Sequence, residues 1–160
     1  NVIKAGLPQM RIQKDGLIIY ITSIAGYMGL PYRGIYSATK GALETITESL
    51  RLETRDLGIR ATCIAPGDFA TAIAAGRYHS PIIKSSPYEA AYGATLRTID
   101  NHVDKGGDPL DVAKLVYRVM LKKHPRIHYK VGSFLQKFSI VLKRILPDKW
   151  YEQLLINYNK

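Results

Sequence analysis

The sequence lacks most of the features that stabilise a secreted protein or that anchor one in a membrane. Cys63 is the single cysteine among 160 residues, so no disulfide can form within the chain, and a reducing, cytoplasmic location is favoured. No apolar run approaches the roughly 20 residues that cross a bilayer, and the first residues do not resemble a signal peptide. Internal repeats and low-complexity segments are also missing. With 46% apolar and 22% charged residues, the composition is typical of a globular domain with its own core.

Acidic residues are scarce in the last third of the chain. Residues 111–160 carry 11 Lys and Arg against 3 Asp and Glu, so they supply +8 of the net charge of +10. The basic character therefore belongs to the tail and needs a local explanation. A solvated basic face explains it as well as a bound polyanion does. We expect no nucleic-acid partner, and peripheral contact with an anionic membrane stays open.

Two apolar segments enclose a helical pattern near the middle of the chain. Residues 16–23 are almost continuously apolar, which is typical of a strand buried on both faces of a parallel sheet, and residues 59–64 form a second such run. Between them, residues 35–57 show helical periodicity, and Gly58 is placed to end that helix in a left-handed turn. The expected apolar face comprises Ala38, Ala42, Ile46, Leu50 and Leu57. A strand, a helix and a strand predict a right-handed crossover unit of an α/β fold.

The remaining elements follow from local signals. We expect helices at residues 4–14, 86–103 and 109–123, and the second of these opens with a capping box, Ser86-Pro87-Tyr88-Glu89. Residues 67–85 form a long irregular stretch, and residues 127–131 form a third strand. Pro147 separates two amphipathic helices, at 134–146 and 148–157. Residues 1–131 thus make up the main α/β part of one domain, and residues 132–160 make up its basic helical tail.

Three polar side chains converge on one edge of the predicted sheet. Tyr36 and Lys40 stand one turn apart on the predicted helix, so their side chains share a face. Ser23 ends the strand that precedes this helix, and Pro66-Gly67 ends the next strand. Open α/β sheets bind their ligands at the carboxyl ends of the strands, where these residues meet. The spacing therefore predicts a reaction centre at that edge.

These residues resemble the motifs of the short-chain dehydrogenase/reductase family. The resemblance rests on Ser23, on Tyr36-Ser-Ala-Thr-Lys40 thirteen residues later, and on Ala65-Pro66-Gly67 with Thr71. Met28-Gly29-Leu30-Pro31 and the stretch from Ala42 to Leu50 look most like the hydroxysteroid and retinol dehydrogenase branch. The resemblance covers about residues 1–131. It implies a Rossmann-type doubly wound parallel sheet, present here only as its carboxyl-terminal part.

The resemblance also implies a reaction and a role for each residue. The activity would be an NAD(P)-dependent interconversion of a fairly apolar ketone or aldehyde with its alcohol, by hydride transfer. Tyr36 would be the general acid for reduction and the base for oxidation, because a nearby ammonium favours a phenolate. Lys40 would supply that ammonium and hold the nicotinamide ribose, and Ser23 would donate a hydrogen bond to the carbonyl oxygen.

Further contacts are implied in the same way. The cofactor, NADP or NAD, would contact a set of residues from both strand ends: Tyr36, Lys40, Pro66, Gly67, Phe69 and Thr71. The substrate would contact Ser23, Ala25, Leu30 and Tyr36, under a lid formed by residues 69–85. Family members pair the long helix with its copy in a second subunit, so we expect a homo-oligomer with a small-residue contact face: Ala38, Gly41, Ala42 and Thr45.

Parts of the family pattern are missing from the sequence. No glycine-rich turn is present to hold a pyrophosphate, and Asn1 lies too close to the first strand to match the family's catalytic asparagine. We therefore expect a carboxyl-terminal piece of a longer enzyme, inactive by itself. A catalytically silent nucleotide-binding scaffold and a membrane-peripheral lipid-carbonyl reductase remain alternatives. His124 and His128 have no acidic or cysteine ligand beside them in the sequence, so we expect no metal site.

Overall fold

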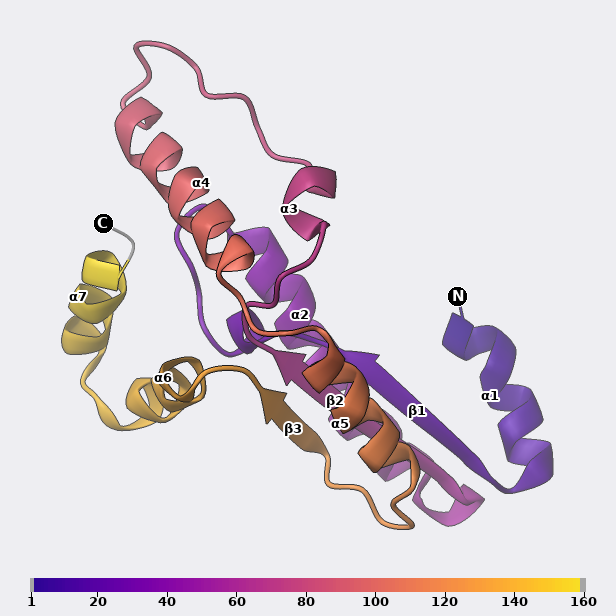
Figure 1. The fold of residues 1–160 in the computed structure, drawn as a ribbon. Coiled ribbons are helices and arrows are strands. Elements are labelled where there is room, and N and C mark those ends of the chain that lie inside the picture. Colours follow the sequence, from indigo (N-terminus) through magenta and orange to yellow (C-terminus); the bar gives the residue numbers. More distant parts are fainter. Residues whose placement is uncertain (1, 159–160) are drawn as a thin grey trace.

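The computed structural model describes residues 2–158, and within them a three-stranded parallel sheet forms the centre of the fold (Figure 1). The strands are β1 (Gly16–Ile21), β2 (Ile59–Pro66) and β3 (His128–Val131), in the order β1-β2-β3. Gly16 pairs with Ile59, and Cys63 pairs with His128. A parallel sheet with helical connections confirms the predicted α/β class.

The central strand is buried, whereas β1 is not. Every residue from Ala61 to Ala65 is inaccessible to solvent, because β2 has a strand on each side. In β1 only Ile18 is buried, and Ile21 is 44% exposed. The expectation that β1 is buried on both faces is wrong for the described residues, because only one of its six residues is buried among them. The apolar run at residues 16–23 correctly predicted a strand of a parallel sheet, but it did not predict that this strand lies at one edge of the described sheet.

The long helix α2 (Gly34–Glu53) connects β1 to β2 and follows a short 3-10 helix, η1 (Ile24–Tyr27). It ends at Thr54, whose hydroxyl donates to the Leu50 carbonyl at 2.8 Å. A second 3-10 turn, η2 (Arg55–Leu57), then leads to Gly58, which has a φ of 72°. A Cβ at Gly58 would collide with the Lys14 carbonyl, so only glycine fits there. The predicted strand–helix–strand unit and its left-handed glycine are thus confirmed.

The buried face of α2 is not the one predicted from periodicity. Ser37, Glu44, Thr47 and Leu50 are buried, whereas Ile46 is 48% exposed and Ala38 and Ala42 are also exposed. Glu44 and Thr47 can face the sheet because each has a hydrogen-bond partner inside, as when Thr47 donates to the Leu43 carbonyl at 2.7 Å. The buried Ser37 hydroxyl has no such partner among the described residues. Of the predicted apolar face, Leu50 is therefore in the core, whereas Ala38, Ala42 and Ile46 lie on the outer side of the helix. Leu57, in η2, is 37% exposed.

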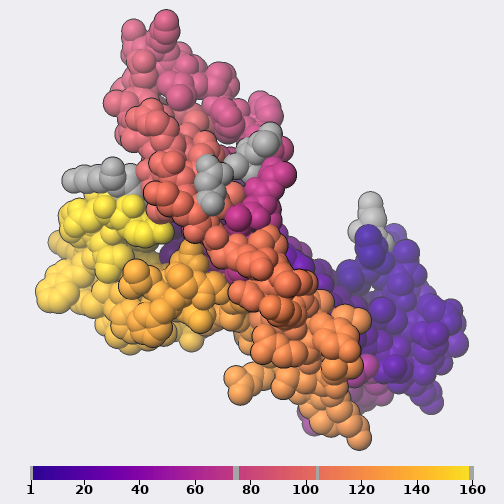
Figure 2. Space-filling view, in the orientation of Figure 1, coloured from indigo at the N-terminus to yellow at the C-terminus, as the bar shows by residue number. Residues whose placement is uncertain are grey.

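The other helices cover the sheet and extend beyond one end of it. They are α1 (Val2–Gln13), α3 (Ile73–Gly76), α4 (Glu89–Asp104), α5 (Leu110–Met120), α6 (Phe134–Ile145) and α7 (Asp148–Tyr158). The three strand arrows point toward the same end of the sheet, and the segment with α3 and α4 lies beyond that end (Figure 1). In the space-filling view this segment projects from the body of the molecule (Figure 2). None of the described helices is long and apolar enough to span a membrane.

The start of α4 differs from the prediction. Its first residue is Glu89, and Tyr88 precedes it without a side-chain cap. Glu89 accepts from the Ser85 backbone at 2.7 Å, and Ser86 accepts from the Tyr88 backbone at 3.2 Å, so the expected capping box does not form. The reason is the positive φ of 64° at Ser85, which turns its N–H toward the glutamate. A reciprocal capping box instead begins α6, between Ser133 and Gln136.

The tail helices pack onto the region that precedes α2. Ile140 of α6 and Tyr151 of α7 form one core cluster with Ile24, Met28 and Ala65. The two helices occur where the sequence predicted them, on either side of Pro147. They therefore contribute to the core beside the carboxyl ends of β1 and β2.

Candidate active site

The three predicted reaction-centre residues lie around the carboxyl end of β1. Ser23 follows the strand and caps η1, where its hydroxyl oxygen accepts from the Ala25 backbone at 3.1 Å. Tyr36 lies in the first turn of α2 and is 39% exposed. The Lys40 ammonium donates to the Ile21 carbonyl at 3.0 Å and lies 5.9 Å from the centroid of the Tyr36 ring. A positive charge thus stands between the end of the strand and the phenol ring.

The predicted cofactor residues follow the end of β2. Pro66 is the last residue of that strand, and the Gly67 backbone donates to the Val131 carbonyl at 2.7 Å. A Cβ on Gly67 would meet the end of the Gln136 side chain, which would have to move aside. Phe69 is buried and forms a β-bridge with Gly107. Thr71, in contrast, is exposed.

Two of the predicted substrate residues, Ala25 and Leu30, face the protein interior, whereas Tyr36 is exposed. Ala25 is buried in η1, and Leu30 packs against the cluster of Ile24 and Met28. Tyr92 of α4 contacts both neighbouring segments: its ring centroid lies 5.2 Å from that of Tyr32, just before α2, and its hydroxyl donates to the Ser80 carbonyl of the predicted lid at 3.0 Å. Arg77, on the lid, pairs with Asp100 of α4 at 2.7 Å.

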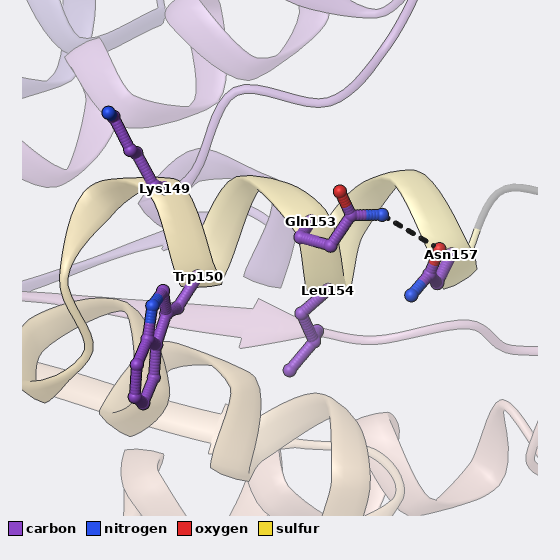
Figure 3. A pocket seen from close by; sticks show the side chains of 5 residues that line it. All are labelled: Lys149, Trp150, Gln153, Leu154 and Asn157. Carbon is purple, nitrogen blue, oxygen red and sulfur yellow. Dashed lines mark hydrogen bonds between the residues drawn. The ribbon is translucent and has the colours of Figure 1, made fainter.

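Two hollows occur on the described surface. One cleft, of about 400 Å³, opens beyond the ends of β2 and β3 and includes the predicted cofactor residue Phe69. Its other walls come from four segments of the chain: Asp68, His102, Lys105, Gly106, Gly107, Asp111, Val131, Gly132, Ser133, Gln136 and Tyr158. The second hollow is lined by five residues of α7 alone, with Gln153 bonded to Asn157 at 3.0 Å (Figure 3). A surface made by one helix contains none of the predicted site residues.

A buried carboxylate that the sequence analysis did not predict lies next to the reaction centre. The Glu44 side chain is only 9% exposed. Its Oε1 accepts from the Thr22 hydroxyl, and its Oε2 accepts from the Tyr27 hydroxyl at 2.8 Å and from the Cys63 thiol at 2.9 Å. His128 Nδ1 lies 2.7 Å from the same Oε2. Four side chains, from the Ser23 loop, β2 and β3, therefore surround one carboxylate.

The surroundings of Glu44 determine its charge and that of its neighbours. Burial by itself raises the pKa of Glu44, but hydrogen bonds from Cys63, Thr22, Tyr27 and His128 together hold that pKa below its ordinary value. Burial and the Glu44 carboxylate both raise the pKa of Tyr27 and the pKa of Cys63. At neutral pH the centre therefore holds an ionised carboxylate, a neutral phenol and a neutral thiol.

The spacing of these residues explains why the sequence did not reveal them. A glutamate in the middle of an amphipathic helix ordinarily indicates a solvated face, and its partners stand up to 84 positions away in the chain. Within residues 2–158 one group, Glu44, Cys63 and His128, brings together atoms that could bind a metal ion. His124, which the sequence analysis considered together with His128, is exposed. The lone cysteine and His128 were thus the only signals available.

Comparisons with known proteins concern the family and the fold of the chain. The family model described as "short chain dehydrogenase" matches residues 1–81. A 3-ketodihydrosphingosine reductase from Bacteroides thetaiotaomicron is 34% identical over 156 residues, which cover 97% of this chain and 58% of that protein. The chain thus spans a little more than half the length of this relative.

Solved structures agree with the fold. A short-chain dehydrogenase from Streptomyces avermitilis superimposes with a TM-score of 0.70 at 27% identity, over 95% of this chain and 56% of that one. A short chain dehydrogenase/reductase from Burkholderia phymatum, determined in complex with NAD, gives the same TM-score at 23% identity, over 89% and 52% of the two chains. The second likeness concerns the fold alone.

Proposed function

Because the chain belongs to the short-chain dehydrogenase/reductase family, we propose that it carries the reaction centre of an NAD(P)-dependent oxidoreductase, with Tyr36 as the proton-transfer group. The observation that carries this proposal is the position of Lys40. Its ammonium lies between the Ile21 carbonyl and the Tyr36 ring, beside the loop that begins at Ser23. This is the arrangement that a phenol needs to exchange a proton with a substrate oxygen.

The proposed reaction assigns one role to each of these residues. A bound nicotinamide supplies or accepts the hydride at its C4 position. In the reducing direction Tyr36 gives its phenolic proton to the carbonyl oxygen, and in the oxidising direction it takes the proton back from the alcohol. Ser23 donates a hydrogen bond to that oxygen, where negative charge develops. Lys40 stabilises the phenolate form of Tyr36 through its charge.

The residues of this chain fit one end of a nicotinamide cofactor. The Lys40 ammonium has three N–H donors. One of them donates to the Ile21 carbonyl, and within residues 2–158 the other two are available to ribose hydroxyls. The buried Phe69 follows Gly67 by two residues and lines the cleft beyond β2, whereas Ser23, Tyr36 and Lys40 do not line it. The bound NAD of the Burkholderia protein supports the same cofactor class. The proposal covers NAD and NADP alike.

A fairly apolar ketone is the substrate class that the lid favours. Ile82 and Ile83 are 45% and 68% exposed there, and the one arginine of the lid, Arg77, is already paired with Asp100. A relative whose name specifies 3-ketodihydrosphingosine, a ketone, supports the same class. The rival proposal, a catalytically silent nucleotide-binding scaffold, gives no role to Ser23, Tyr36 and Lys40.

The test is a single-atom change in the full-length protein. Tyr36→Phe keeps the ring but deletes the transferable proton, so turnover of ketone with NADH or NADPH should fall by about 10²–10⁴-fold while the fold survives. Tyr32→Phe is the matched control, since this neighbouring tyrosine is also exposed and should lose no activity. Near-normal hydride transfer by Tyr36→Phe between pH 7 and 9 would exclude the mechanism and leave the scaffold proposal standing.

A peripheral membrane location is a second proposal, favoured by one face of α6. Its apolar residues divide into two sets, because Leu142 and Leu146 pack against the core while a second stripe lies in solvent. This outer stripe comprises Phe134, Phe138, Val141 and Ile145, which recur at helical spacing. Lys137 and Arg144 are exposed on the same helix. Such a face suits the surface of an anionic bilayer, from which an apolar ketone could enter.

Vesicle sedimentation tests this second proposal. The full-length protein should sediment with vesicles of phosphatidylserine and phosphatidylcholine, and less so in 0.5 M salt, because salt screens the basic residues. Phe138→Ser should weaken the binding, whereas Ser139→Ala, on the inner side of the same helix, should not. Equal recovery with neutral vesicles would exclude a preference for anionic lipid, and no recovery with either kind of vesicle would exclude membrane contact.

A further inference from the structure

Both ends of the loop that carries Ser23 are bonded to a single carboxylate, that of Glu44. Thr22, directly before Ser23, donates to Oε1, and Tyr27, four residues after Ser23, donates to Oε2. We propose that Glu44 is a positioning residue: it fixes the Ser23 loop against the helix that carries Tyr36 and Lys40. This inference rests on the proposed function, since it concerns the alignment of those reacting groups.

The helix makes the alignment rigid. Tyr36, Lys40 and Glu44 follow one another at intervals of four residues on α2, so they lie along one side of a single helix. A helix rises about 1.5 Å per residue, which fixes Glu44 about 12 Å along the axis from Tyr36. A bond from Glu44 to the Ser23 loop therefore sets where Ser23 lies relative to Tyr36. Misplacement of about 1 Å between reacting groups can cost a hundredfold in rate.

Further contacts hold the strand end in the same frame. The Thr22 backbone donates to the Ile64 carbonyl at 2.8 Å, which extends the pairing of β1 and β2 by one residue. Lys40 donates to the carbonyl of Ile21, the last residue of β1. The residues on either side of the Thr22–Glu44 bond are thus already fixed. Glu44 adds the hydrogen bonds that join both ends of the Ser23 loop to α2.

The carboxylate has a fixed position of its own. A buried carboxylate is costly unless donors compensate it, and here Cys63 and His128 do so from β2 and β3. His128 is held in turn by Glu48, one helical turn beyond Glu44, at 2.9 Å from Nε2. Glu44 is therefore set by the sheet as well as by the helix.

Two lysines contact Tyr27, at the far end of the Ser23 loop. Lys130 lies 4.9 Å from the centroid of the Tyr27 ring, and Lys143 donates to the Tyr27 carbonyl at 2.8 Å. These contacts restrain the backbone and ring of Tyr27, so that its hydroxyl is kept beside Glu44. Tyr27 is the last residue of η1, which makes it the far anchor of the loop.

Glu44, Cys63 and His128 could together be considered a zinc site, but the distances between their ligand atoms favour hydrogen bonds. Glu44 Oε2, Cys63 Sγ and His128 Nδ1 lie 2.7 to 3.1 Å apart. Ligands arranged tetrahedrally around zinc lie about 3.3–3.5 Å apart, as zinc bonds of about 2.0 Å to nitrogen or oxygen and 2.3 Å to sulfur require. The donor–acceptor pairing also leaves none of these three side chains unsatisfied among the described residues. The proposal is accordingly one of hydrogen-bonded positioning.

The experiment compares kinetics in full-length variants that keep the shape of the side chain. Glu44→Gln should lower kcat for ketone reduction by about ten- to a hundredfold and change KM for the nicotinamide less than about twofold. Thr22→Val deletes one anchor in a nearly isosteric way and should also lower kcat, whereas Thr22→Ser keeps the hydroxyl and should restore it. Thr62→Val is the matched control, because Thr62 is likewise a buried threonine and donates to the Arg126 carbonyl on the far side of β2. It should leave kcat unchanged.

A second measurement does not depend on turnover. Amide hydrogen exchange of residues 22–28 should speed up by about tenfold in Glu44→Gln and in Thr22→Val, and not in Thr62→Val. Unchanged kcat and unchanged exchange in both variants would overturn the positioning role, even where Tyr36→Phe has abolished turnover and so supported the proposed function. If Tyr36→Phe has no effect, the proposed function fails instead. Stoichiometric zinc in the purified protein, lost in Glu44→Gln, would also overturn the proposal in favour of a metal site.

Discussion

Gly26 and Gly41 meet backbone to backbone where the Ser23 loop crosses the long helix. A Cβ on Gly41 would lie 2.9 Å from the Gly26 carbonyl oxygen, and a Cβ on Gly26 would lie 3.0 Å from the Gly41 backbone nitrogen. Both distances are shorter than carbon makes in ordinary packing. The loop can approach α2 this closely only because both residues are glycine. The contact lies within one turn of Lys40, so it bears directly on the candidate reaction centre.

We therefore predict that Gly41→Ala displaces the loop from the helix. The added methyl group has a backbone carbonyl opposite it, so it should cost about 1–3 kcal/mol of stability through overpacking and should also lower turnover. Gly34→Ala, in the first turn of the same helix, would meet nothing within 4 Å and should be neutral or slightly stabilising. Thermal unfolding and steady-state kinetics on the two variants check the prediction. Equal stability and turnover in both would show that the loop adapts freely.

The sequence predicted the elements of this fold better than it predicted which of their faces are buried. The two apolar runs at 16–23 and 59–64, and the proline between the tail helices, marked strands and helix ends through local chemistry alone. The inner face of α2 could not be found in this way, because Glu44 and Thr47 are polar and periodicity assigns polar residues to solvent. The burial of Glu44 depends on donors from the residue after β1, from β2 and from β3, which only the tertiary structure brings together.

The same distinction holds for the candidate site. Tyr36 and Lys40 could be paired from their spacing on a helix, and Ser23 could be added because parallel strands end at a common edge. Tyr27 and His128 could not be added, since neither follows a motif and 101 positions separate them in the chain. The burial of Ala25 also had no signal in the sequence, because η1 is too short for a periodic pattern.

Cys63 should be unreactive while the protein is folded. Its side chain is fully buried, and burial together with the hydrogen-bonded Glu44 carboxylate raises the pKa of the thiol. Only the thiolate reacts with iodoacetamide, so we expect no labelling of Cys63 at pH 8 over hours, and rapid labelling in 6 M guanidinium. Peptide mapping by mass spectrometry identifies the labelled position. Lys123→Cys, which places a thiol at an exposed position after α5, should react within minutes and serves as the control. Native labelling of Cys63 at a comparable rate would contradict the buried network.

The depressed pKa of Glu44 predicts an acid-dependent part of the stability. The folded state holds the carboxylate ionised at a pH where an unfolded glutamate, with an ordinary value of 4.5, has begun to take up a proton. Its contribution is therefore complete above about pH 5 and is lost as the pH falls through the lower folded value. Glu44→Gln cannot titrate, so its free energy of unfolding should change less between pH 5 and pH 3 than that of the wild type. Denaturant titrations across this range measure the difference.

The control for this acid dependence is one helical turn away. Glu48 is 53% exposed, and Glu48→Gln should retain the slope of stability against pH in the same window because Glu44 still titrates. If Glu44→Gln and the wild type lose stability in parallel down to pH 3, the hydrogen bonds to Glu44 do not depress its pKa.

The last prediction concerns the stripe that α2 turns away from its own sheet. Ile35, Ala38, Ala42 and Ile46 recur at helical spacing, on the side of the helix opposite Glu44, and Ile35 is 83% exposed. Gly41, which we expected in the contact face, is instead covered by Gly26. Exposed apolar stripes on a long helix are typical of an interface between subunits, so we predict that the full-length protein is a homodimer or homotetramer with this face at a two-fold axis.

Ile46→Arg should bury an unpaired charge in this interface and reduce the mass measured by light scattering at micromolar concentration at least twofold. Ile83→Arg makes the same substitution on the exposed lid and should leave the mass unchanged. A monomeric wild type, or an Ile46→Arg variant of unchanged mass, would place the interface elsewhere or remove it.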